Sequence, residues 1–227
     1  PGFAFAAIDD DNEEVLAFSN GSTTCDSITL LSTDANGNSV RSPEQLTSFG
    51  GQALFLASTA SGTGLYVTHD LMVTNDGGAP ELVFPFGVEE FLVQGDVIYV
   101  VASDGDVYRI SDDFSYERIA DPANRPTLQI NDIFAMNGEI YARGWTSDTQ
   151  NDLFRVDDTN DRLVELNIAE NAGGDDFRLY DGAVGETLFY YWFPDPDGGT
   201  ELHVSDGTAG TDLVLDIRPG SGSSLIT

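Results

Sequence analysis

Lysine is absent from this chain of 227 residues, and nine arginines face 39 aspartates and glutamates, which gives a formal charge of −30. Binding to nucleic acid depends on clustered cations, so this composition excludes nucleic acid as a partner. The same shortage excludes a polybasic membrane patch, and no run approaches the roughly 18 apolar residues of a membrane-spanning helix. The sequence therefore predicts no direct membrane insertion.

Cysteine is nearly absent as well. With Cys25 alone, the chain cannot form an intramolecular disulfide and carries no C-x-x-C metal or redox motif. The sequence starts at Pro1 without a charged and then apolar leader, so we expect a mature or excised piece. Hydrophobic residues make up 41% of the chain, including 14 Phe and 8 Tyr. This content favours a folded core over a disordered acidic tail.

The excess of short carboxylates over ammonium groups indicates a salty or calcium-rich environment. So large a net charge destabilises a compact state by self-repulsion, and salt screens that repulsion. We therefore interpret the chain as halophilic or marine. The alternative is an ordinary acidic surface protein in which codon bias replaced lysine by arginine.

An internal repeat of about 45 residues fills the chain. A glycine followed by an apolar, aromatic-rich segment recurs at Gly2, Gly51, Gly95, Gly138 and Gly185. A polar turn residue recurs with a similar period at Asn20, Asp70, Asp112, Asp158 and Asp206. Two independent markers thus agree on five repeats, and periods of this length are typical of repeat architectures.

Each repeat has the pattern of four short strands separated by Gly, Asn and Asp turns, and no segment has a helical period. Examples are residues 44–49, 53–58, 64–69 and 81–86 in the second repeat, and 88–94, 97–103, 106–111 and 115–120 in the third. The predicted fold is all-β: a five-bladed β-propeller of four-stranded antiparallel blades, forming a single domain over 1–227. The chain begins at a second strand, so the C-terminal strand is expected to close the first blade. The approximate blade limits are 1–40 with 221–227, 41–86, 87–121, 122–168 and 169–220.

The fifth repeat resembles a known family. Residues 201–211 read ELHVSDGTAGT, and DLVLDIRPGSGSS follows up to Ser224. This stretch is similar to the ELWxxDGT repeat of large bacterial surface and secreted proteins, although His203 stands where that repeat has Trp. The spacer between DGT and the next GT is also one residue shorter. The resemblance implies propeller-like repeats on an extracellular or cell-surface protein.

Two acidic loops between expected second and third strands have oxygen donors suited to Ca²⁺, which takes six to eight oxygens. The first is the loop of Asp195, Asp197 and Glu201, with a glycine in its turn. The second contains Asp9, Asp11 and Glu13. The alternative is that these segments are only good turns, since Pro and Gly preset turn geometry. We predict Ca²⁺ as a cofactor that orders these loops.

Both tryptophans, Trp145 and Trp192, are expected to close second strands of neighbouring blades, with Tyr191 beside Trp192. On a loop face they would form a stacking platform for a sugar ring, with carboxylates binding its hydroxyls. The alternative is that they wedge between blades. The recurring Asn and Asp residues are expected to form structural Asx turns on the opposite face.

Motifs of nucleophilic or metal-dependent catalysis are missing. The two histidines, His69 and His203, belong to different repeats, and neither G-x-S-x-G nor H-E-x-x-H occurs. The leading hypothesis is a non-catalytic adhesion or recognition module that binds a glycan or a protein partner on its loop face. The alternatives are a self-assembling structural subunit of a filament, sheath or large surface protein, and a glycoside-active enzyme using paired carboxylates.

Overall fold

The structure is a computed structural model. It describes residues 3–19, 28–59, 62–68, 79–124, 128–145, 151–166, 180–184, 189–194, 200–207, 212–215 and 222–223. All regular structure in these segments is β-strand and none is helix, which confirms the all-β prediction. In the same segments, no helix is present that could span a membrane.

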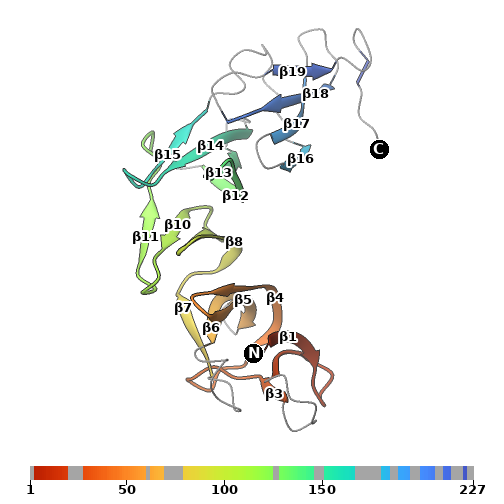
Figure 1. Cartoon of the computed structure of the whole chain (residues 1–227), viewed down its shortest axis with the longest axis vertical. Coiled ribbons are helices and arrows are strands. Elements are labelled where there is room, and N and C mark those ends of the chain that lie inside the picture. Colours follow the sequence, from red (N-terminus) through yellow and green to blue (C-terminus); the bar gives the residue numbers. More distant parts are fainter. Residues whose placement is uncertain are drawn as a thin grey trace. The chain divides into compact units, whose positions relative to one another are not determined.

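The strands pair with their neighbours along the chain (Figure 1). The first sheet has three strands, β1 (Phe3–Ile8), β2 (Glu14–Ser19) and β3 (Ile28–Leu31). The second has four, β4 (Arg41–Phe49), β5 (Gln52–Thr59), β6 (Gly62–Thr68) and β7 (Pro80–Phe84). The third also has four, β8 (Val88–Gln94), β9 (Val97–Ala102), β10 (Val107–Ile110) and β11 (Tyr116–Ile119).

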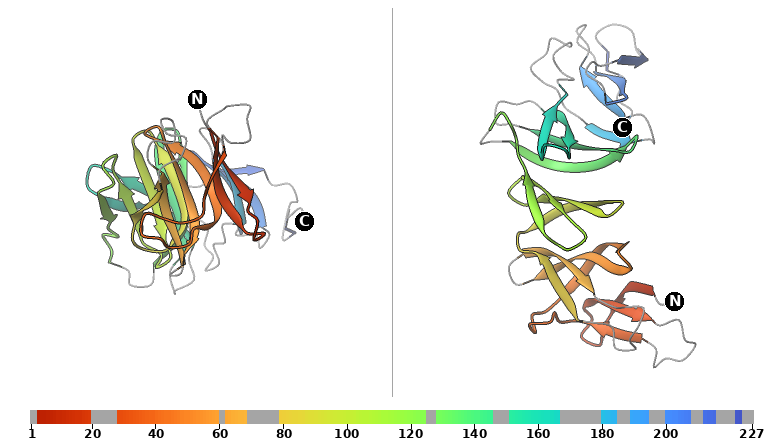
Figure 2. Two further views of the ribbon diagram at one scale, coloured as in Figure 1. Left: turned by 90° about the horizontal axis from the view of Figure 1, so that it is seen from below. Right: turned by 60° about the vertical axis from the view of Figure 1, so that its left-hand side comes forward.

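The fourth sheet contains β12 (Gln129–Met136), β13 (Glu139–Trp145), β14 (Asn151–Asp157) and β15 (Arg162–Glu165). The fifth contains β16 (Tyr180–Val184), β17 (Phe189–Pro194), β18 (Thr200–Ser205) and β19 (Asp212–Leu215). The order within each sheet is that of an antiparallel meander, and Figure 2 gives two further views of the sheets. The strands predicted for the second and third repeats are found in the second and third sheets.

Three of the recurring glycines, Gly51, Gly95 and Gly138, lie in two-residue turns between strands, whereas Gly2 and Gly185 lie outside the described residues. Gly51 and Gly138 have φ of +82° and +79°, each at the second position of its turn. Such tight hairpin turns match the twist of the flanking strands and require positive φ, which glycine adopts without steric cost. The sequence marker thus reports a backbone requirement that is repeated from sheet to sheet.

Central strands are buried along most of their length, whereas outer strands are exposed. In β9 every residue from Ile98 to Ala102 is buried, while β11 is exposed up to Ile119. A strand with apolar side chains on both faces can be buried only if both faces are covered. This pattern explains the continuous apolar runs of β5, β9 and β13.

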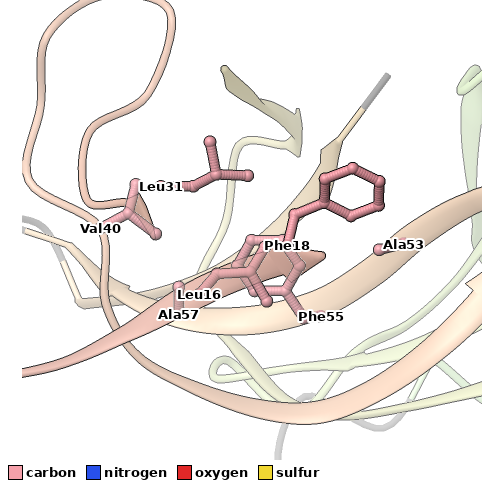
Figure 3. Packing of buried hydrophobic residues seen from close by; sticks show 7 residues of the cluster. All are labelled: Leu16, Phe18, Leu31, Val40, Ala53, Phe55 and Ala57. Atoms are coloured by element: carbon pink, nitrogen blue, oxygen red, sulfur yellow. The ribbon is translucent and has the colours of Figure 1, made fainter. Parts of the chain in front are cut away.

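The first two sheets enclose a core between them. Phe18 of β2 and Phe55 of β5 are at most 2% exposed, and Figure 3 shows their rings together beside Leu16 and Leu31. The whole cluster comprises Leu16, Phe18, Leu31, Val40, Ala53, Phe55 and Ala57. Burying an aromatic side chain contributes roughly 1.5 to 3 kcal/mol, so this cluster supplies much of the local stability.

The chain divides into two compact units. The first comprises Pro1–Ser103 with Ile110–Tyr116, and the second comprises Asp104–Arg109 with Glu117–Thr227.

Candidate functional site

Trp145 is a large exposed aromatic residue at the end of a strand. It is the last residue of β13, opposite Gln129 of β12 and Asn151 of β14, and it is 45% exposed. A ring at a strand end with nearly half its surface in solvent is available for stacking against a ligand.

Gln129 connects this strand end to the β9–β10 loop. Its Nε2 donates to the carbonyl of Asp104 at 3.0 Å, and Gly105 accepts a backbone bond from Ile130 at 3.0 Å. Gly105 has φ of +84°, and a Cβ there would come within 2.7 Å of Gln129 Cδ. The glycine therefore allows the loop to lie directly against the start of β12.

The same loop carries a charged pair. Nε and Nη2 of the Arg118 guanidinium donate to the two oxygens of the Asp106 carboxylate, each at 2.6 Å, and the two side chains are 53% and 32% exposed. The hydrogen bond to Asp106 is the main cause that raises the pKa of Arg118. The pair is fixed and partly solvent-exposed, and its free edges can still bind hydroxyl groups.

The other two predicted ligand-binding residues lie in β17, where the structure describes only the backbone. Tyr191 is paired with His203, and Trp192 with Leu202. The strand continues past Trp192 to Pro194, which is paired with Thr200. The sequence predicts Trp192 to be the last residue of its strand, as Trp145 is. This prediction is wrong, because β17 continues for two residues beyond Trp192.

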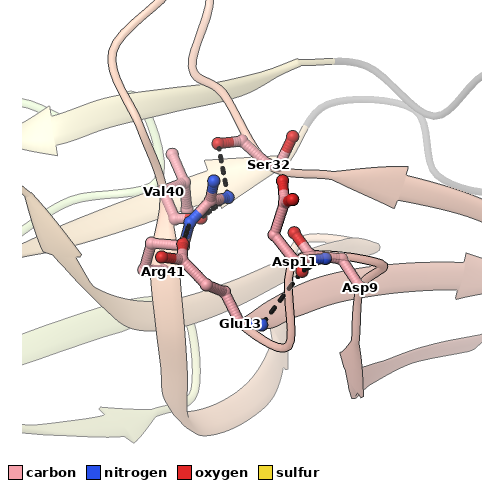
Figure 4. A network of polar contacts seen from close by, with 6 residues as sticks. All are labelled: Asp9, Asp11, Glu13, Ser32, Val40 and Arg41. Atoms are coloured by element: carbon pink, nitrogen blue, oxygen red, sulfur yellow. Dashed lines mark hydrogen bonds and ion pairs between the residues drawn. The ribbon is translucent and has the colours of Figure 1, made fainter.

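The acidic loop between β1 and β2 is closed by its own hydrogen bonds (Figure 4). Asp9 Oδ1 accepts the backbone N–H groups of Asp11 at 3.0 Å and of Glu13 at 2.9 Å. The Glu13 carboxylate pairs with the Arg41 guanidinium, which also donates to the carbonyl of Ser32 at 3.3 Å. Two of the three predicted calcium ligands thus already have protein partners.

The other predicted calcium loop lies largely outside the described residues. This applies to Asp195 and Asp197, while Glu201 is buried in β18 opposite Phe193, with 1% of its surface exposed. In the described segments, no three or more His, Cys, Asp or Glu side chains are arranged to hold a metal ion. Calcium binding at either loop stays a prediction.

His203 also lies on the buried face of β18. It is 7% exposed, and Glu201 and Ser205 on either side of it are buried as well. The alternation of buried and partly buried positions along this strand is regular, so His203 packs inside the fold. The other histidine, His69, lies outside the described residues.

The recurring polar turn residues can be compared in the described turns. After β10, Asp113 Oδ1 accepts bonds from the Ser115 N–H at 2.9 Å and the Ser115 hydroxyl at 2.6 Å. After β14, Asp157 binds the side chains of Asn160 and Arg162. After β18, Ser205 Oγ accepts the N–H of Gly207 at 3.1 Å. These side chains lie next to the recurring Asp112, Asp158 and Asp206, and Asx turns at the recurring residues themselves stay a prediction. Asn20 and Asp70 lie outside the described residues.

Every arginine in the described part of the chain is in an ion pair. The six are Arg41, Arg109, Arg118, Arg143, Arg155 and Arg162. Each contacts one or more carboxylates, so the charge of these few cations is already paired within the protein. The Asp and Glu residues in the described segments outnumber these six arginines.

Sequence reasoning did not identify Gln129, Asp106 or Arg118 as neighbours of the Trp145 strand. No motif marks them, since their connection depends on strand register and on a loop from the preceding sheet. The signal available in the sequence was Gly105, a glycine between two aspartates just after an apolar strand.

No protein-family model matches the chain, and no curated protein sequence does either. Among solved structures, the β-propeller domain of the Trilobed protease from Pyrococcus furiosus is similar, with a TM-score of 0.51 and 13% identity over 96% of this chain and 66% of that one. A structure from a study of two prolyl endopeptidases has a TM-score of 0.56 and 11% identity, covering 96% of this chain and 34% of that one. Puromycin hydrolase has a TM-score of 0.56 and 16% identity, covering 91% and 34%. The chain spans about a third of the length of the last two proteins. At these identities the likeness shows the fold alone: antiparallel sheets arranged like those of a β-propeller.

Proposed function

We propose that the chain forms five blades with the limits given by the repeat, and that the C-terminal strand completes the first. The support is that the first sheet has three strands, whereas each of the other four sheets in the described residues has four. The edge strand β1 contains Phe3 and Ile8, which are 59% and 62% exposed. A fourth strand there would cover an apolar edge that otherwise invites aggregation.

We propose that the protein is a non-catalytic recognition module of an extracellular or cell-surface protein, and that its loop face binds a glycan. The observation that carries this proposal is the exposure of Trp145 at a strand end, beside the loop that holds Asp104 and Asp106. An aromatic face with a few fixed polar groups nearby is the usual composition of a sugar site. The resemblance to the ELWxxDGT repeat agrees with this location.

Titration with cellohexaose and chitohexaose, followed by tryptophan fluorescence and calorimetry, tests the glycan proposal. Trp145→Ala should reduce affinity by about tenfold or more, because loss of a stacking aromatic costs at least 1 to 2 kcal/mol. Ile28→Ala is the matched control, since Ile28 is 50% exposed on β3, outside the loop face. Binding that survives Trp145→Ala unchanged, or no response to a broad glycan array, would contradict the proposal.

A second candidate is the propeller portion of a longer peptidase. The similar solved structures favour it, because this chain matches about a third of the prolyl endopeptidase structure. Mass spectrometry of the native protein, captured with antibodies to this chain, distinguishes the two. A polypeptide about three times as long that hydrolyses peptides supports the second candidate, and one without such activity contradicts it.

A further inference from the structure

An aromatic cluster reaches the surface of the first unit where β7 leads into β8. Phe84 is fully buried, while Phe86 and Tyr116 are 43% and 42% exposed. The ring centroids are 5.2 Å apart for Phe84 and Phe86, 5.4 Å for Phe84 and Tyr116, and 6.0 Å for Phe86 and Tyr116. All three pairs are edge to face, with interplanar angles of 70° to 89°.

This geometry holds two exposed rings in place. Edge-to-face contacts align the positive ring edge with the negative ring face, so the buried Phe84 anchors both Phe86 and Tyr116. Side chains already fixed before binding lose little entropy when a partner docks. Leu82, which is 48% exposed, lies two residues before Phe84 on β7. We call Phe86 and Tyr116 the aromatic patch.

The first unit, which carries this patch, is strongly acidic. It contains 16 Asp and Glu residues and a single arginine, Arg41, which is paired with Glu13. Hydrogen bonds from the Ser115 side chain and backbone lower the pKa of Asp113, so that carboxylate stays ionised. The exposed acidic residues within four positions of Phe86 or Tyr116 are Glu89, Asp112, Asp113 and Glu117, and the exposed cation Arg118 lies two residues after Tyr116.

We propose that the aromatic patch is the docking site for a cationic segment of another protein, one that presents arginine or lysine beside aliphatic side chains. The ring faces of Phe86 and Tyr116 attract guanidinium or ammonium groups, and the aliphatic stems of those side chains cover the apolar surface. The carboxylates of the first unit favour the approach of a cation and repel an anion. The patch uses none of the residues of the Trp145 site, so it stands independently of the glycan proposal.

Fluorescence anisotropy at physiological ionic strength tests this docking site. The probe is a fluorescein-labelled peptide of alternating Arg and Leu, and the comparison peptide has Glu in place of Arg. The full chain should bind the first and not the second. The double variant Phe86→Ala/Tyr116→Ala should weaken binding by about 10- to 100-fold, since buried aromatic anchors dominate interface energies. Leu30→Ala, which changes an exposed apolar residue of β3, should stay within about twofold of wild type.

The double variant keeps the net charge, so it separates the patch from general attraction to an acidic surface. Equal affinity of the double variant and the wild type would overturn the proposal, as would absence of binding to the wild type. If the double variant does not fold, Phe86→Leu and Tyr116→Leu keep apolar volume and remove the ring faces. Each should weaken binding by about threefold or more. Unchanged affinity in both leucine variants would again overturn it.

Discussion

The hydroxyl of Tyr141 on β13 lies against the α-carbon of Gly207, in the turn after β18. A Cβ added at Gly207 would overlap Tyr141 Oη, and Gly207 has φ of +84°. The Tyr141 hydroxyl also donates to Glu139 Oε2 at 3.4 Å, and burial is the main cause that raises its pKa. Glycine is thus required at position 207 for two reasons: the backbone has a positive φ, and Tyr141 of the fourth sheet occupies the space that a Cβ would need.

Gly207→Ala should destabilise the protein more than Gly138→Ala does. Gly138 has φ of +79° with no atom within 4 Å of an added Cβ, so its substitution costs only the left-handed conformation, about 1 to 2 kcal/mol. Gly207→Ala adds the overlap with Tyr141, roughly 1 to 3 kcal/mol more. Urea unfolding of both variants measures the difference. In the double variant Gly207→Ala/Tyr141→Phe part of the extra loss should be recovered, and equal losses for the two glycines would contradict this account.

Asp34→Asn should remove a pH-dependent part of the stability. Burial disfavours the Asp34 carboxylate, but hydrogen bonds from the Asn38 side chain and from the backbone of Asn38, Asn36 and Gly37 outweigh it, so the pKa lies below the usual 3.8. A lowered folded pKa stabilises the fold above pH 3.8, and this stabilisation is lost as pH falls through the folded pKa. The difference in unfolding free energy between wild type and variant should therefore be constant near neutral pH and shrink below about pH 4. Acid also protonates the other carboxylates and so reduces charge repulsion in both proteins. This contribution cancels when the unfolding free energies of wild type and variant are subtracted. If the difference in unfolding free energy grew as the pH fell, the prediction would be contradicted.

Arg109→Gln should cost about 1 kcal/mol in the second unit. Its guanidinium pairs with Glu117 at 3.0 Å and Asp161 at 2.9 Å, and it donates to the carbonyl of Asp158 at 3.1 Å. Arg155→Gln makes the same change in net charge but removes a single 3.3 Å pair with Glu139, from a side chain that is 41% exposed. Exposed single pairs contribute little, so this control should cost less than about 0.5 kcal/mol. Thermal unfolding at low ionic strength compares them, and identical losses would mean that net charge alone matters.

Thermal unfolding in NaCl and CaCl₂ tests the calcium prediction. With a charge of −30, both salts should raise the unfolding temperature through screening. A specific site adds RT ln(1 + [L]/Kd) in CaCl₂ at equal ionic strength, about 2.7 kcal/mol at a hundred times Kd. Asp195→Asn/Asp197→Asn should abolish this excess. Asp9→Asn should leave it in place, because Asp9 Oδ1 already accepts two backbone bonds. Equal effects of both salts on the wild type would rule out a calcium site.

The sequence by itself determined the repeat, the strand positions and the hairpin turns. These follow from local rules: side chains alternate along a strand, and a two-residue turn such as that at Gly138 needs positive φ. The same rules predicted the β8 strand at residues 88–94, which the structure reproduces. The shortage of cations was also visible at once.

Only the tertiary structure decided which residues meet. Arg109 reaches Asp161, 52 residues further along the chain, and Gln129 brings Trp145 next to the β9–β10 loop. The turn-closing carboxylate after β10 belongs to Asp113, because the exact turn geometry selects which of two adjacent aspartates faces the backbone. Such contacts depend on strand register and sheet packing. A register shift of one residue would replace every cross-strand neighbour, although the amino-acid pattern along each strand would stay the same.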